Sequence, residues 1–218
     1  QFQVAETPVN LGATYMAAGV GRNRTFNHIT NTVRTDVNRA DVFALDLSAE
    51  FSGLSVAFDY AQSILLRSDN RVVGRNNTAF DIRASYPFND RWRGTLGYRE
   101  IGPYFVAPGN WGRIGYLYNP SDLKGTYLRT DYQVAENLSV ALAVDAYTGT
   151  AKLPFNRGYQ GRDRVRRIQL DAHYRYAPRL RFHLTYENVG WEINSLALNN
   201  QRGKPEWNYL TLRAVYQL

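Results

Sequence analysis

Cysteine is absent from the 218 residues, which excludes disulfide frameworks, thiolate metal sites and cysteine nucleophiles. Long apolar runs are missing as well, since the longest uncharged stretch, residues 7–21, is interrupted by Pro8, Asn10 and Thr14. No transmembrane helix of about 20 apolar residues can therefore be placed. Phosphate-binding glycine loops, serine nucleophile elbows and paired catalytic carboxylates at motif spacing are also lacking.

Aromatic and basic residues are abundant. The chain has 14% aromatic residues, including 16 tyrosines, and a net charge of +7 from 26 Lys+Arg against 19 Asp+Glu. A basic balance of this size usually indicates nucleic acid or an anionic surface as partner. The position of the charges decides between these two, and it follows from the periodicity of the chain.

The strongest pattern is alternation of apolar and polar residues with period two. It predicts hairpins over residues 42–63, 80–99, 126–146 and 168–187, with a first strand at 11–20 and a last one at 210–218. Short turns alternate with long connections, so all the turns should share one end of the sheet. Most of the ten strands have about 9–12 residues and match the roughly 9–11 of a tilted bilayer crossing. We predict an all-β fold in a single domain over residues 1–218, an up-and-down antiparallel transmembrane β-barrel of about ten strands.

A soluble barrel or sandwich would show the same alternation with the apolar face inside. Four features favour lipid on the outside. The apolar face is charged only at Glu100, Lys124 and Arg166, all near the long loops, where a side chain can reach the interface. Small residues lie among the charges of the polar face, and the strand number is even. Aromatic residues gather at the turn end, as in an interfacial girdle: Phe51, Tyr86, Trp92, Tyr132, Tyr174, Tyr176, Phe182 and Tyr216. The expected location is the bacterial outer membrane.

The polar face is then expected to line the interior. Its acids and bases nearly balance, and two histidines lie among them: Asp46, Glu50, Asp59, Asp81, Arg83, Arg91, Arg93, Arg99, Arg129, Asp131, Asp145, Arg167, Asp171, His173, Arg175, Arg181, His183, Glu187 and Arg213. Such residues would fill a narrow lumen with cross-strand ion pairs, and the alternative is an arginine-lined path that favours anions. The excess positive charge belongs to the loops, which favours outer-membrane lipid and lipopolysaccharide-like glycolipid as partners over nucleic acid.

The two histidines on adjacent strands are the nearest approach to acid–base chemistry. His173 is close in sequence to Asp171, and His183 is close to Glu187. Ten-stranded outer-membrane proteases carry such residues near the outer rim, whereas these lie near the turn at 177–178. We therefore expect a hydrogen-bonded interior pair without catalysis, and neither a metal site nor a cofactor.

The connection over residues 102–121 is unusually apolar, with three prolines and one charge. It could fold into the mouth as a constriction, pack on a neighbouring protein, or form a self-packed ordered loop. The residues that suggest the first two roles are Tyr104, Phe105, Trp111, Arg113, Tyr116 and Tyr118.

Two stretches resemble known families. Residues 209–218 look like the closing strand of bacterial outer-membrane β-barrels, with Leu218 as the terminal residue. Residues 97–140 are similar to the barrel region of S-layer-homology-domain outer-membrane porins. The similarity is carried by the stretch 97–125, which contains Gly102-Pro103-Tyr104 and Gly115-Tyr116. The resemblance implies a porin-like or structural envelope protein, with S-layer or other envelope proteins as partners and a possible oligomer. The alternatives are a rim-active outer-membrane enzyme and a soluble ligand-binding β-barrel.

Overall fold

The structure, a computed structural model, describes residues 2–4, 7–19, 37–67, 72–73, 77–102, 105, 107, 113–114, 117–118, 122–149, 164–192, 204 and 206–217. Ten long strands dominate it: β2 (Thr7–Gly19), β3 (Val37–Phe51), β4 (Leu54–Arg67), β6 (Thr78–Asn89), β7 (Trp92–Ile101), β10 (Leu123–Ala135), β11 (Leu138–Thr148), β12 (Arg164–Ala177), β13 (Leu180–Glu192) and β14 (Glu206–Tyr216). Four short strands accompany them: β1 (Phe2–Val4), β5 (Val72–Val73), β8 (Arg113–Ile114) and β9 (Leu117–Tyr118). The described residues contain no helix that could span a membrane.

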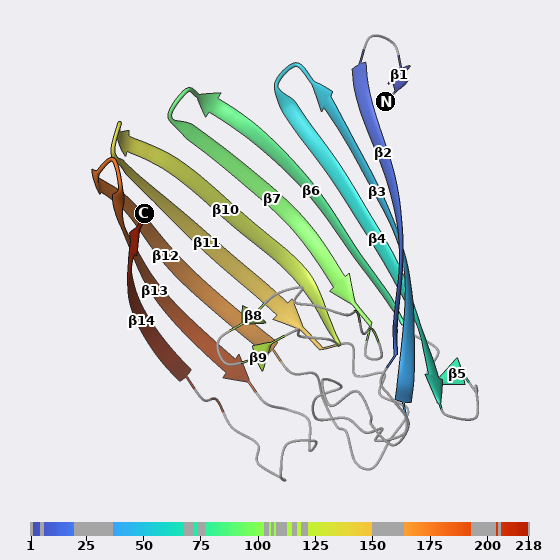
Figure 1. Cartoon of the computed structure of the whole chain (residues 1–218). Coiled ribbons are helices and arrows are strands. Elements are labelled where there is room, and N and C mark those ends of the chain that lie inside the picture. The colour runs from blue at the N-terminus through green and yellow to red at the C-terminus, as the bar shows by residue number, and fades with distance from the viewer. Residues whose placement is uncertain are drawn as a thin grey trace.

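Each long strand pairs antiparallel with the next one along the chain (Figure 1). The short turns at 52–53, 90–91, 136–137 and 178–179 all lie at one end of the sheet. The predicted all-β, up-and-down fold of ten strands is confirmed. The short strands were not predicted, because two or three residues are too few to show alternation; β1 extends the sheet beyond β2, β5 pairs with β4, and β8 pairs with β9.

The sheet is curved and open, with β14 at one edge and β2, flanked by β1, at the other (Figure 1). No pairing joins β2 to β14 in the described part of the chain, so closure into a barrel stays a prediction. The strands are nevertheless staggered as in a barrel. The stagger can be followed from one cross-strand partner to the next across the sheet. This row of partners starts at Asn10, near the turn end of β2, and ends at Trp207, near the long-loop end of β14.

The two faces of the sheet differ sharply in chemistry. Large hydrophobic side chains such as Leu45, Leu96 and Leu212 are exposed on one face, here called the apolar face. Every exposed large hydrophobic residue of the described chain projects from this face except Met16. The opposite face, here called the ionic face, carries the predicted charged residues, in keeping with the period of a pleated strand.

Both ends of the apolar face are bordered by polar or amphipathic side chains. At the turn end, Trp92 stacks on Phe88 with ring centroids 4.6 Å apart and donates from Nε1 to Thr130 at 2.6 Å. At the long-loop end, Arg39 and Asp41 form a 2.9 Å ion pair. Further polar residues continue this border across the sheet: Glu100, Lys124, Arg164, Arg166, Asn188, Glu192, Lys204, Glu206 and Asn208. The prediction that only Glu100, Lys124 and Arg166 charge this face is too narrow, because the strands extend beyond the alternating stretches. The apolar surface between the two borders, here called the apolar band, is therefore shorter than the strands.

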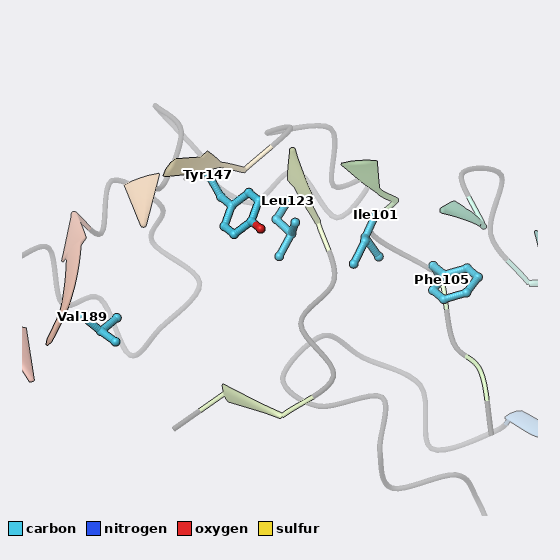
Figure 2. Packing of buried hydrophobic residues seen from close by; sticks show 5 residues of the cluster. All are labelled: Ile101, Phe105, Leu123, Tyr147 and Val189. Atoms are coloured by element: carbon cyan, nitrogen blue, oxygen red, sulfur yellow. The ribbon is translucent and has the colours of Figure 1, made fainter. Parts of the chain in front are cut away.

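A compact hydrophobic cluster lies at the long-loop end of the ionic face. Ile101, Leu123, Tyr147 and Val189 come from four strands, and Phe105 comes from the connection between β7 and β10 (Figure 2). Phe105 is only 5% exposed. This end of the ionic face is thus covered by apolar packing, whereas the charged residues lie nearer the middle and the turn end.

Candidate functional site

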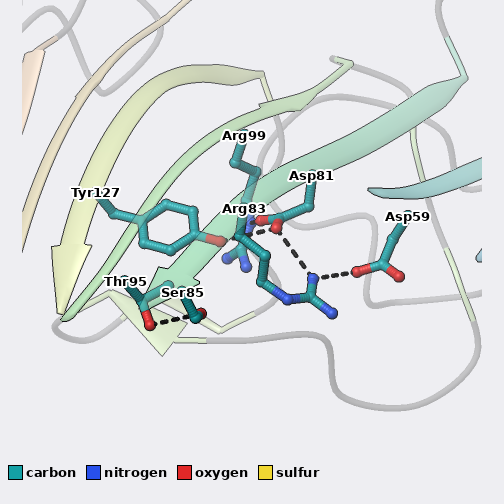
Figure 3. Close-up of polar contacts among 7 residues, drawn as sticks. All are labelled: Asp59, Asp81, Arg83, Ser85, Thr95, Arg99 and Tyr127. Carbon is teal, nitrogen blue, oxygen red and sulfur yellow. Dashed lines mark hydrogen bonds and ion pairs between the residues drawn. The ribbon is translucent and has the colours of Figure 1, made fainter. Parts of the chain in front are cut away.

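The most connected group on the ionic face surrounds Asp81 on β6 (Figure 3). Arg99 donates from Nε to Asp81 at 2.8 Å, Tyr127 donates from its hydroxyl at 2.7 Å, and Arg83 lies 3.2 Å away. Arg83 also bonds to Asp59, and the Arg99 guanidinium lies 5.4 Å from the Tyr127 ring centroid. The carboxylate of Asp81, 7% exposed, accordingly accepts from three donors.

Register explains why these residues meet. Asp46, Asp59 and Asp81 are direct cross-strand partners on three successive strands. Carboxylates in directly opposite positions repel one another, so the row needs cations beside it. Arg99 is the next member of the row, on β7, and Arg83 lies one row away on β6. The two arginines convert a repulsive row into a charge-assisted network.

A second network joins β11, β12 and β13. Arg167 bonds to Asp145 and lies 3.7 Å from Glu187, while the Tyr147 hydroxyl donates to Asp145 at 3.1 Å. Glu187 is fully buried and Asp145 nearly so. Burial of such charges requires pairing, and one guanidinium between two carboxylates supplies it.

The remaining carboxylates have weaker partners. Arg129 and Asp131 form a 2.9 Å ion pair in which both side chains are largely exposed. Asp171 accepts from Gln169 at 2.7 Å and from Thr185 at 2.6 Å. Neutral donors therefore hold Asp171, which forms no ion pair within the described residues.

Acids and bases are unevenly placed along the ionic face. Between the middle of the strands and their long-loop ends, the acids outnumber the bases: Asp46, Asp59, Asp81, Asp145 and Glu187 against Arg83, Arg99 and Arg167. From the middle of β10 and β12 to the turn end of β7 to β14, the bases are in excess: Arg91, Arg93, Arg129, Arg175, Arg181 and Arg213 against Asp131 and Asp171. Glu50 lies at the turn end of β3, away from these arginines. The near balance expected from the sequence holds for the sum, while the structure separates the two signs.

His173 and His183 are direct cross-strand partners whose rings meet edge to face at 4.4 Å. The carboxylates expected beside them are held elsewhere, since Thr185 donates to Asp171 and Arg167 approaches Glu187. The pair lies near the turn between β12 and β13, as predicted. Over the described ranges, no three His, Asp or Glu side chains are arranged to hold a metal ion.

The connection 102–121 is described only in part. Phe105 is buried on the ionic face, which agrees with a loop that folds inward. Arg113 and Tyr118 are backbone partners in the β8–β9 hairpin. Tyr104, Trp111 and Tyr116 lie outside the described residues, so a constriction by this connection stays a prediction.

Tyr127, Tyr147 and Gly97 belong to the networks but were not among the predicted site residues. In the alternation of their strands, both tyrosines stand at the positions that project from the ionic face. This position was the signal in the sequence that could have identified them. Gly97 is the direct partner of Tyr127, and a Cβ at this position would overlap the ring. Only the register of β7 against β10 reveals that relationship.

Comparison with known proteins gives no assignment. Neither a scan against family models nor a search of curated proteins finds a match to this chain. The function is therefore argued from the two faces of the sheet.

Proposed function

We propose that the chain is an outer-membrane β-barrel protein of a bacterium, with lipid against the apolar face and a charged, porin-like interior lined by the ionic face. The observation that carries the proposal is that nearly all the exposed large hydrophobic side chains lie on one face of a single-layer sheet. A soluble protein of this architecture would cover that face with a second layer, because exposed apolar patches of this extent mark interaction surfaces. Lipid is a partner that covers such a face evenly.

The height of the apolar band supports a bilayer. On β7 the band extends from Trp92 at the turn end to Glu100 near the long-loop end. These eight residue steps cover about 26 Å along the strand at about 3.3 Å per residue, and tilt shortens this span along the membrane normal. The apolar band of outer-membrane barrels is about 25 Å tall. Aromatic side chains at one border and ion pairs at the other suit the two interfaces.

The interior favours a narrow passage. The networks around Asp81 and Arg167 extend from the middle of the ionic face toward the long-loop end, where Phe105 packs. Ten strands enclose little more space than the eight that side chains can fill. The role that we propose is therefore passage of small solutes or a structural place in the envelope, with S-layer proteins as a possible class of partner on the basis of the sequence resemblance.

Lipid contact is tested by quenching tryptophan fluorescence with lipids brominated in their acyl chains. Two variants each keep one tryptophan, Trp92 on the apolar face or Trp207 on the ionic face, with phenylalanine replacing the others. After reconstitution into vesicles, we expect strong quenching of Trp92 and weak quenching of Trp207. Equal quenching of the two, or a chain that folds in buffer without detergent, would refute the proposal and favour a soluble binding barrel.

Passage is tested on the same protein in planar bilayers. Small, discrete conductance steps are expected for a narrow charged lumen. A lipid-embedded protein without conductance would leave the structural envelope role as the better description. Hydrolytic activity that is lost on replacement of His173 or His183 would instead support the rim-active enzyme.

A further inference from the structure

Five side chains that are cationic or can become so lie together at the turn end of β12, β13 and β14. Arg175 is the direct cross-strand partner of Arg181. His173 is the partner of His183, which is in turn the partner of Arg213. These five residues are here called the basic cluster. Like charges in directly opposite positions destabilise a sheet, so the arrangement calls for a counter-anion.

Among the described residues, the acids near the basic cluster do not pair with its arginines. In the part of the chain that the structure describes, its arginines form no ion pair with a carboxylate. Asp171 is the nearest acid along the face, and it is held by Gln169 and Thr185. Arg175 reaches Glu136 in the adjacent turn, but only its main-chain carbonyl, at 3.4 Å. The arginines in the middle of the ionic face, by contrast, are each bonded to a carboxylate.

Four members of the cluster, His173, Arg175, Arg181 and His183, line a hollow of about 400 Å³, and Glu136 is the one acid in its lining. Gln133 and Ser139 also line it and add neutral donors beside the cations. A neighbouring hollow of about 700 Å³ shares Gln133, Ser139 and His173 with the first. Its charged lining consists of three arginines and two acids: Arg91, Arg93, Arg129, Asp90 and Asp131. The two hollows form a basic vestibule at the turn end, large enough for a small oxyanion with its hydration water.

We propose that the basic cluster binds a multivalent oxyanion, specifically the phosphate group of a small solute. Guanidinium groups match phosphate oxygens in geometry and retain their charge. An anion between Arg175 and Arg181 replaces their mutual repulsion with two attractive contacts. The inference deepens the proposed function and rests on it in one respect, namely that the anion enters the barrel from the turn end. Binding itself needs only the folded sheet.

The test is isothermal titration of the full chain in detergent micelles with pyrophosphate, sulfate and chloride at constant ionic strength. The cluster variant is Arg175→Gln with Arg181→Gln. The matched control is Arg39→Gln with Arg164→Gln, which removes the same charge from the opposite face. We expect the wild type and the control to bind pyrophosphate most tightly and chloride least, and the cluster variant to lose at least tenfold in pyrophosphate affinity.

Circular dichroism of each variant checks that the sheet is intact. Equal loss of affinity in the two double variants, or no saturable binding by the folded wild type, would overturn the proposal. A second titration in micelles doped with phosphatidylglycerol separates two sources of phosphate: suppressed pyrophosphate binding assigns the site to lipid headgroups, and unchanged binding assigns it to soluble anions. Anion binding by a protein whose Trp92 escapes lipid quenching would refute the proposed membrane location alone.

Discussion

Tyr127 on β10 donates a 2.7 Å hydrogen bond to Asp81 on β6, although β7 lies between the two strands. The ring can cross because the residue beneath it on β7 is Gly97. A glycine covered by a cross-strand aromatic ring is a recurrent device for fixing register and curvature in a sheet. Three strands are thereby tied together on the ionic face.

Replacing Gly97 by alanine should therefore destabilise the protein. The new methyl group overlaps the Tyr127 ring, and such overpacking costs about 1–3 kcal/mol. Urea unfolding in lipid vesicles measures the change. Gly190→Ala is the matched control, because a Cβ at Gly190 meets no atom within 4 Å. Adding Tyr127→Ala to Gly97→Ala should restore part of the loss, and a strictly additive pair would contradict this account.

Asp81→Asn should cost more stability than Asp131→Asn. Asp81 is buried and accepts hydrogen bonds from Arg83, Arg99 and Tyr127. Loss of its charge should lower the free energy of unfolding by about 2 kcal/mol. This is below the usual range for a buried ion pair, because more than a third of each arginine side chain is exposed to solvent. Asp131 has one exposed partner, Arg129, and its loss should stay under about 1 kcal/mol. Equal effects in urea unfolding would show that the Asp81 network is not a structural centre.

Phe105→Ala should alter passage through the interior. The side chain anchors part of the β7–β10 connection to Ile101 and Leu123, and its removal should cost about 3 kcal/mol and loosen that connection. In planar bilayers we expect larger or noisier conductance steps. Phe88→Ala removes a phenylalanine from the exposed apolar face and should leave conductance unchanged. If both variants conduct like the wild type, the connection does not form a constriction.

The position of the apolar face relative to the bilayer can be tested by placing a single arginine at two different depths. Leu128 lies near the middle of β10, and Leu128→Arg should cost about 2–4 kcal/mol in a bilayer. Thr126→Arg lies two residues closer to Lys124 and to the polar border, where the cost falls to about 0–1 kcal/mol. Folding yield in vesicles against urea concentration gives both values. In a soluble protein the two substitutions would have similar, small effects, because both side chains are already exposed.

Closure of the sheet can be tested cleanly because the chain lacks cysteine. Leu11→Cys on β2 is combined in turn with Leu210→Cys, Leu212→Cys and Ala214→Cys on β14. We expect one combination to form a disulfide within a monomer under mild oxidation, read by non-reducing electrophoresis. Disulfide-linked dimers in place of monomers would indicate that the edges pair with a second copy.

The alternation of apolar and polar residues was sufficient to predict the ten strands, their order and the face of the charges within the alternating stretches. It missed the charges at strand ends that extend beyond those stretches: Arg39, Asp41, Arg164, Glu192 and Glu206. It could not predict which charges meet, because that depends on register between strands. Asp59 and Arg83, for instance, are 24 residues apart and meet because β4 and β6 align Asp59 with Asp81. The separation of acids from bases has the same origin, since strand stagger decides how far each residue lies from the turns. Phe105 was recognisable as unusual, but its packing partners come from strands distant in sequence.

The order of strands in the sheet also bears on how the chain folds. Nine of the ten long strands pair with the long strand that follows them, four through two-residue turns and five through connections of 10 to 21 residues. The entropic cost of closing a loop grows only slowly with its length, so each of these pairings costs less than a pairing between the two ends of the chain. Hairpins can therefore assemble in sequence, each one serving as the template for the next. Only the union of β2 with β14 would join segments from opposite ends of the chain, and this step would set the pace at which a closed barrel appears.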